Sequence, residues 1–292
     1  MSVTDREIIK TLSERLGLTS VDAEYDDDGH IISLDLADKK LSQLPPEIGQ
    51  LTSLQSLSLN NNQLSQLPPE IGHLSNLHSL HVIRNRLRQL PSEIGHLSNL
   101  QTLHLDFNQL RQLPSEIGHL ANLKWLLLGK NQLSQLPPDI GYLSNLKRLY
   151  LEDNQLSQLP AEIGHLTNLQ WLYLDNNWLN QLPSEIAQLT GLQRLSLAHN
   201  QLRQLPPEIG QLTNLRQLSL EGNLPLQSPP PEIVGTTAIL VYLRGLLDKS
   251  TAHYEAKLLI VGEGGTGKSS LLRALRNQYF DTALSTDLGI NC

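Results

Sequence analysis

The chain has 292 residues, of which 39% are hydrophobic, so it has a length typical of one or two domains and enough apolar material for a core. Its formal net charge of −7 argues against a nucleic-acid partner, because such proteins need an excess of Lys and Arg to displace counterions. The single cysteine, Cys292, excludes an intramolecular disulfide framework, and neither a secretory signal nor a long apolar run occurs. We therefore expect a cytoplasmic protein without a transmembrane segment.

Residues 1–30 are expected to form an N-terminal cap helix and a turn. Apolar residues within residues 4–17 recur at helical spacing, namely Ile8, Ile9, Leu12 and Leu16. The acidic run at residues 26–28 precedes Gly29 but lacks the other ligands of a calcium loop. We interpret this run as a solvated turn.

Residues 31–228 repeat with a period of 23 residues. Leu-Pro pairs recur at this spacing and begin at Leu44, Leu67, Leu90, Leu113, Leu136, Leu159, Leu182 and Leu205. The shared frame, L-x-x-L-x-L-x-x-N-x-L-x-x-L-P-x-E-I-G, closely resembles the leucine-rich repeat family. A first unit with Lys39 in place of the asparagine brings the count to nine.

The frame also predicts an α/β solenoid on physical grounds. Alternation within L-x-x-L-x-L indicates one short strand per unit, and stacked units give a parallel sheet on the concave face of a horseshoe. The L-P-x-E-I-G segment is expected to return along the convex side, where glycine permits the turn. The recurring asparagine is expected to satisfy backbone groups where the chain leaves each strand, and it occurs as Asn62, Asn85, Asn108, Asn131, Asn154, Asn177, Asn200 and Asn223.

The concave face carries a candidate protein-binding patch. Outward side chains occupy the third and fifth positions of L-x-x-L-x-L, and neighbouring strands lie ~4.8 Å apart. The bulky ones gather in units five to seven: Trp125, Leu127, Arg148, Tyr150, Trp171 and Tyr173. Trp, Tyr and Arg are enriched in interface hot spots, so we expect a protein ligand here. The alternative is that these aromatic residues only pack on one another.

The histidines offer a second candidate site, for a metal. Four of them recur at one repeat position, which indicates duplication: His73, His96, His119 and His165. His81 and His104 occupy neighbouring units and are expected to meet as solvated or stacked imidazoles. Without a converging carboxylate in the pattern, we expect no metal at either place.

The repeat frame breaks near its end, where Pro225 and Ser228 replace leucines. Residues 229–252 are expected to hold a C-terminal cap helix and a linker, with the helix over residues 232–249. A solenoid exposes apolar surface at both ends, so this helix should seal the last repeat.

Residues 253–292 begin with an apolar run at 256–261, which suits a buried strand, and continue into a phosphate-loop pattern. After the glycines, apolar residues recur at helical spacing, which predicts a helix. The predicted nucleotide contacts are Gly262, Glu263, Gly264, Gly265, Thr266, Gly267, Lys268, Ser269 and Ser270. Backbone N–H groups of such a loop surround phosphate oxygens, while Lys268 would neutralise the β- and γ-phosphates and Ser269 would bind Mg²⁺.

The order of repeats, a Y-L-x-x-L-L helix and a phosphate loop resembles the Roco proteins. This resemblance implies a Roc-type, Ras-like GTPase domain that binds GTP or GDP with Mg²⁺, and a COR domain for dimerisation. Residues 285–291, STDLGIN, resemble the first switch of small GTPases, which makes Thr286 a second candidate metal contact. Immune-type nucleotide-switch ATPases are the nearest rival, but their repeats usually follow the nucleotide domain.

The chain departs from that family after Lys268, because neither D-x-x-G nor N-K-x-D follows. Guanine is therefore implied by the resemblance alone. We expect an incomplete Roc-like domain that binds nucleotide weakly by itself. Two functions stay open: a protein-binding module attached to the start of a regulatory GTPase, and a GTPase enzyme in a longer product. For these 292 residues we favour the binding module.

Overall fold

The computed structural model describes residues 4–248. The predicted phosphate loop at residues 262–270 and the predicted metal contact Thr286 lie outside the described residues. They stay predictions of the sequence. No helix among residues 4–248 is both long enough and apolar enough to span a membrane.

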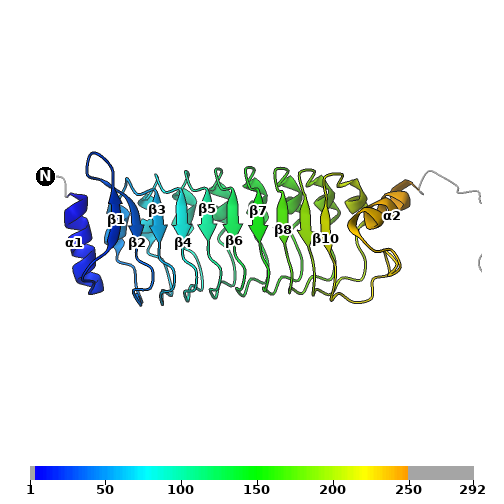
Figure 1. Ribbon diagram of the computed structural model, residues 1–292, viewed down its shortest axis with the longest axis horizontal. Coiled ribbons are helices and arrows are strands. Elements are labelled where there is room, and N and C mark those ends of the chain that lie inside the picture. The colour runs from blue at the N-terminus through cyan, green and yellow to red at the C-terminus, as the bar shows by residue number, and fades with distance from the viewer. Residues whose placement is uncertain (1–3, 249–292) are drawn as a thin grey trace, which may run out of the picture. The chain divides into compact units, whose positions relative to one another are not determined.

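Residues 4–248 form a ten-stranded sheet whose strands follow one another in chain order (Figure 1). Strands β2 to β10 pair in parallel, and each residue pairs with its equivalent in the next repeat, as Leu126 does with Leu149. The leucine-rich repeat solenoid expected from the sequence is thereby confirmed. The strands are β1 (Asp22–Tyr25), β2 (Ile31–Asp35), β3 (Ser56–Ser58), β4 (Ser79–His81), β5 (Thr102–His104), β6 (Trp125–Leu127), β7 (Arg148–Tyr150), β8 (Trp171–Tyr173), β9 (Arg194–Ser196) and β10 (Gln217–Ser219).

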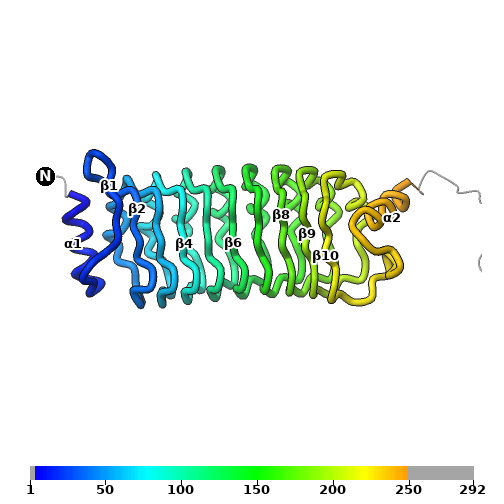
Figure 2. The backbone as a smooth tube through the Cα atoms, in the orientation of Figure 1, coloured from blue at the N-terminus to red at the C-terminus, as the bar shows by residue number. Residues whose placement is uncertain are grey.

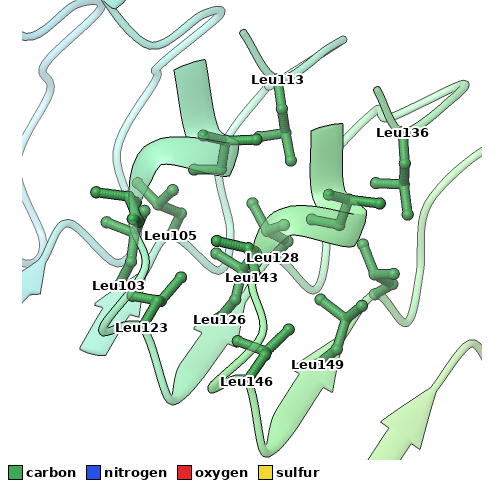
Figure 3. Close-up of a cluster of buried hydrophobic side chains, with 14 of the residues drawn as sticks. Leu103, Leu105, Leu113, Leu123, Leu126, Leu128, Leu136, Leu143, Leu146 and Leu149 are labelled. Atoms are coloured by element: carbon green, nitrogen blue, oxygen red, sulfur yellow. The ribbon is translucent and has the colours of Figure 1, made fainter. Parts of the chain in front are cut away.

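The leucines of the frame build one continuous core beneath the sheet (Figure 3). Leu123, Leu126 and Leu128 of one unit are completely buried, as are Leu146 and Leu149 of the next. Leu126 and Leu128 point inward because side chains two residues apart along a strand face the same side of the sheet. Stacking of equivalent leucines therefore places the same side chain in the same environment in each unit.

The return segments form 3-10 helices that stack side by side from unit to unit. Their glycines have a different role from the one expected. A Cβ atom on Gly141 would lie 2.6 Å from the carbonyl oxygen of Glu162 in the next unit, so glycine is needed here for close stacking rather than for a turn. The helix at Ser184–Gln188, in contrast, has Ala187 at this position. The helices are η1 (Pro46–Gln50), η2 (Pro69–His73), η3 (Ser92–His96), η4 (Ser115–His119), η5 (Pro138–Tyr142), η6 (Ala161–His165), η7 (Ser184–Gln188) and η8 (Pro207–Gln211).

The predicted asparagine ladder is confirmed, and Asn154 shows its geometry. The Asn154 Oδ1 atom accepts a hydrogen bond from the backbone N–H of Leu133 at 2.9 Å. Its Nδ2 atom donates to the carbonyl oxygens of Leu128 and Leu151 at 2.9 and 3.1 Å. Each buried asparagine thus joins its own unit to the preceding one.

Helices close both ends of the stack, as the smooth tube in Figure 2 shows. Helix α1 (Asp5–Leu16) begins with a capping box between Thr4 and Glu7. Helix α2 (Thr236–Asp248) packs on η8 and buries Ile239, Leu240 and Leu243. It begins four residues later than predicted.

One strand was not predicted. Strand β1 pairs with β2 in antiparallel orientation and extends the sheet toward α1. The predicted acidic turn joins these two strands: the Asp26 Oδ1 atom accepts hydrogen bonds from the backbone N–H groups of Asp28 and His30. A carboxylate that bonds nearby N–H groups stabilises such a turn.

Candidate protein-binding surface

The third-position side chains of strands β6 to β9 form a ladder of alternating aromatic rings and guanidinium groups. The residues Trp125, Arg148, Trp171 and Arg194 are neighbours in register across these strands. The guanidinium carbon of Arg148 lies 3.7 Å from the ring centre of Trp171 and 5.5 Å from that of Trp125. Arg194 covers Trp171 from the other side at 4.8 Å. These are cation–π distances, and we call this row the Trp-Arg ladder.

The ladder leaves its two tryptophans unequally exposed. Trp125 is 44% exposed, whereas Trp171 is only partly exposed because arginines contact it from both sides. Trp171 is therefore less exposed than its outward-facing strand position suggests, and Arg194 lies beside it although the predicted patch did not include this residue. The regular alternation along the third position was the signal that could have found it.

The fifth-position side chains form a second row beside the ladder. The rings of Tyr150 and Tyr173 are stacked, with centres 4.8 Å apart and an interplanar angle of 16°. Leu127 continues this row on β6. Burial raises the pKa of Tyr150, and the neighbouring Tyr173 raises it further. All six residues of the predicted patch therefore lie on adjacent strands of one sheet face.

A row of carboxylates, which was not among the predicted sites, lies where these strands end. The carboxylates follow the last leucine of L-x-x-L-x-L and are Asp106, Glu152 and Asp175; Gly129 occupies the same position in the unit between Asp106 and Glu152. Burial raises the pKa of Glu152, and the three neighbours Asp106, Asp153 and Asp175 raise it further. Reading this seventh position across the units would have found the row.

The opposite edge of the same strands is basic. Lys124 and Lys147 directly precede β6 and β7, and both are exposed. The Nζ atom of Lys124 donates a hydrogen bond to Oε1 of Gln101 at 2.8 Å. The charge of the surface therefore changes sign along the strands: lysines lie where the strands begin, aromatic residues in the middle and carboxylates where the strands end.

His81 and His104 meet on neighbouring strands, as expected. Their ring centres lie 5.9 Å apart at 59°, and Nε2 of His104 lies 2.7 Å from Oδ2 of Asp106. Burial lowers the pKa of His81, and His104 lowers it further. Within residues 4–248, no group of three or more His, Cys, Asp or Glu side chains is arranged to hold a metal ion. The four repeated histidines are exposed and each one ends a 3-10 helix.

Phe107 forms a smaller feature beside this surface. It has a φ of 58°, which is unusual for a bulky residue, and it is 40% exposed. Arg84 and Lys130 lie 5.2 and 4.6 Å from its ring centre. The equivalent residue has a positive φ in most units, so this conformation belongs to the repeat rather than to a site at Phe107.

Comparisons with known proteins agree with this architecture. A family model described as "Leucine-rich repeat region" matches residues 83–149 and 137–257, and one described as "Leucine Rich Repeat" matches residues 53–74. No match was found among curated proteins. Among solved structures, a leucine-rich repeat protein of Leptospira interrogans is 43% identical with a TM-score of 0.63, over 68% of this chain and 57% of that one.

Two plant receptors are also similar. The leucine-rich repeat ectodomain of the Arabidopsis thaliana receptor kinase GASSHO1/SCHENGEN3, in complex with CASPARIAN STRIP INTEGRITY FACTOR 2, is 32% identical with a TM-score of 0.63, over 70% of this chain and 26% of that one. The plant peptide hormone receptor RGFR1, in complex with RGF2, is 32% identical with a TM-score of 0.54, over 65% and 35%. The chain spans less than two thirds of each of these proteins. By its repeats, its sheet and the family models that match it, the chain belongs to the leucine-rich repeat family.

Proposed function

We propose that the sheet face around Trp171 binds a protein or peptide ligand. The Trp-Arg ladder carries this proposal, because it gathers on one face the residue types that dominate interface hot spots. The repeat core beneath consists of completely buried leucines, so the fold does not depend on the ladder.

Mutual packing of the aromatic residues is compatible with this function. The stacked tyrosines and the guanidinium groups hold one another in place, so a ligand would meet side chains that have already lost rotamer freedom. Trp125 still offers an exposed ring surface. In addition, the two similar plant receptors were solved in complex with CASPARIAN STRIP INTEGRITY FACTOR 2 and with RGF2.

The test uses a phage-displayed library of random 12-residue peptides, selected on the complete chain. We expect Trp171→Ala to weaken selected peptides by ~30-fold or more, because truncating a hot spot costs ~2 kcal/mol or more. Trp178→Ala is the matched control, since Trp178 is 52% exposed but lies in the loop after β8. Circular dichroism checks that both variants are folded. Unchanged binding by a folded Trp171→Ala variant would refute the proposal.

We also propose that residues 262–270 bind nucleotide phosphates, with GTP as the nucleotide and Mg²⁺ held by Ser269 and Thr286. The phosphate-loop pattern supports the phosphate contacts, and the resemblance to Roco proteins supports guanine. The test is binding of a fluorescent GTP analogue to the full-length gene product, with GTP and ATP as competitors. We expect Lys268→Ala to abolish binding. Retained binding by this variant would contradict the role of the loop in phosphate binding. Stronger competition by ATP than by GTP would contradict guanine as the base. A cytoplasmic location and dimerisation through a COR domain stay predictions.

A further inference from the structure

Lysines and arginines gather where strands β6 to β10 begin, without any carboxylate among them. Positions two and three of L-x-x-L-x-L contain neither Asp nor Glu in units five to nine, and neither Lys nor Arg in units one to four. The whole chain has 29 acidic and 22 basic residues, so this local excess is opposite to its overall charge. We call the five cations the basic strip: Lys124, Lys147, Arg148, Arg194 and Arg216.

Two arginines of the basic strip are held in place by Trp171 but are not neutralised. The guanidinium carbons of Arg148 and Arg194 lie 3.7 and 4.8 Å from the centre of its ring. Within residues 4–248, neither arginine forms an ion pair with a carboxylate. Arg148 also interacts with the side chain of Tyr150, but a guanidinium group has five N–H donors and so retains others. A guanidinium group that stacks through its face keeps its N–H groups in its plane, where they can bind a carboxylate with two parallel hydrogen bonds.

The two lysines extend the basic strip to β6. They lie on neighbouring strands, because the backbone N–H of Lys147 donates to the carbonyl oxygen of Lys124 at 2.9 Å. Both side chains are exposed, as is that of Arg216 at the other end of the strip. Neighbouring strands are ~4.8 Å apart, so the strip crosses the sheet over roughly 20 Å, the length of about six residues of extended peptide.

The opposite end of these strands disfavours a broad polyanion. The carboxylates of Asp106, Glu152 and Asp175 occupy position seven, roughly 16 Å along the strand from position two. A nucleic-acid duplex would cover both edges and meet these carboxylates, and like charges that face each other are unfavourable. A single peptide segment that crosses the strands can contact the basic strip alone and place apolar side chains on Tyr150 and Tyr173.

We propose that the ligand of this surface is an acidic peptide segment, whose Asp or Glu side chains pair with arginines of the basic strip while its apolar side chains lie on the stacked tyrosines. This inference rests on the proposed function, because it names the chemistry of the ligand bound at the same face. Arg148 or Arg194 would donate two hydrogen bonds to a ligand carboxylate. Lys124 and Lys147 would attract the segment from a distance and accelerate its association.

The experiment is a double-mutant cycle on peptides selected from the random library on the complete chain. Selected peptides should be enriched in Asp or Glu. Replacing an enriched residue by Asn or Gln in the synthetic peptide should weaken binding about 10-fold on the wild-type chain, as expected for hydrogen bonds between charged groups. On the Arg148→Gln or the Arg194→Gln chain, whichever lacks the arginine that pairs with it, the same replacement should change affinity less than about 2-fold.

Arg111→Gln is the matched control for general charge effects. Arg111 is exposed, but it lies beyond the asparagine of its unit and outside the strands. Its replacement removes the same charge and should leave the affinity and the effect of the peptide replacement unchanged. Circular dichroism checks that all variants are folded. A fluorescent DNA duplex should bind more weakly than the selected peptides, and tighter binding of the duplex would overturn the peptide as ligand of the strip.

The outcomes separate the two proposals. Peptides that depend on Trp171 but lack enriched acidic residues overturn the acidic ligand and leave the proposed function intact. The same holds for peptides whose carboxylates contribute equally on the wild-type, Arg148→Gln and Arg194→Gln chains. Peptides that are indifferent to Trp171→Ala overturn the proposed function and the inference that rests on it. A library that yields no binder on the wild-type chain also overturns both.

Discussion

Replacing Asn154 by alanine tests how the asparagine ladder holds successive repeats together. The side chain of Asn154 is buried and makes hydrogen bonds to Leu133, Leu128 and Leu151. After truncation the two carbonyl oxygens each keep another asparagine, Asn131 for Leu128 and Asn177 for Leu151. The backbone N–H of Leu133 loses its partner.

The expected loss of stability follows from the hydrogen bonds that Asn154→Ala removes. An unsatisfied buried donor costs ~1–3 kcal/mol, and the lost hydrogen bonds to the carbonyl oxygens add ~1 kcal/mol. We therefore expect Asn154→Ala to lower the free energy of unfolding by ~2–4 kcal/mol. The assay is urea-induced unfolding followed by circular dichroism, with the slope of the transition unchanged so that its midpoint reports stability.

Asn145→Ala is the matched control. Asn145 is exposed, and its Nδ2 atom donates to the carbonyl oxygen of Ala121 at 2.9 Å. Water replaces this hydrogen bond, so the cost should stay within ~0.5–1 kcal/mol. Equal losses of stability in Asn154→Ala and Asn145→Ala would refute the reasoning that burial of the ladder stabilises the stack.

Two other predictions concern stability. Gly141→Ala should lower the free energy of unfolding by ~1–3 kcal/mol, because the new Cβ meets a backbone oxygen of the next unit. Gly245→Ala is the control: Gly245 lies in helix α2, a Cβ there would have no atom within 4 Å, and the free energy of unfolding should rise by ~0.5–1 kcal/mol. Destabilisation by both substitutions in urea unfolding would contradict the stacking argument. In the folded chain the pKa of Glu152 is raised above its ordinary value of 4.5. The native state therefore holds the proton of this carboxyl group to a higher pH than the unfolded chain does. The protonated carboxyl group contributes stability below pH 4.5, and this contribution is lost as pH rises through the folded-state pKa. Urea midpoints should therefore show Glu152→Gln gaining stability over wild type from pH 4 to pH 7. Parallel pH profiles for wild type and Glu152→Gln would exclude this effect.

The candidate site was only partly predictable from the sequence. Trp125, Arg148 and Trp171 could be placed on one face, because the period of 23 residues determines which strand positions are neighbours. That Trp171 lies between two arginines, and that Glu152 bends over Gly129, depend on side-chain rotamers across units. A repeat pattern contains no information on these rotamers, since each is set by the residues of adjacent repeats.

The fold shows the same division. Leucine spacing and the recurring asparagine by themselves determined the parallel sheet, its register and the buried ladder, because each contact joins residues one repeat apart. Only the tertiary structure revealed β1 and the reason for the glycines such as Gly141. The strand β1 forms because β2 would otherwise be an unpaired edge beside α1, and Gly141 is required by a neighbouring backbone that no local pattern describes.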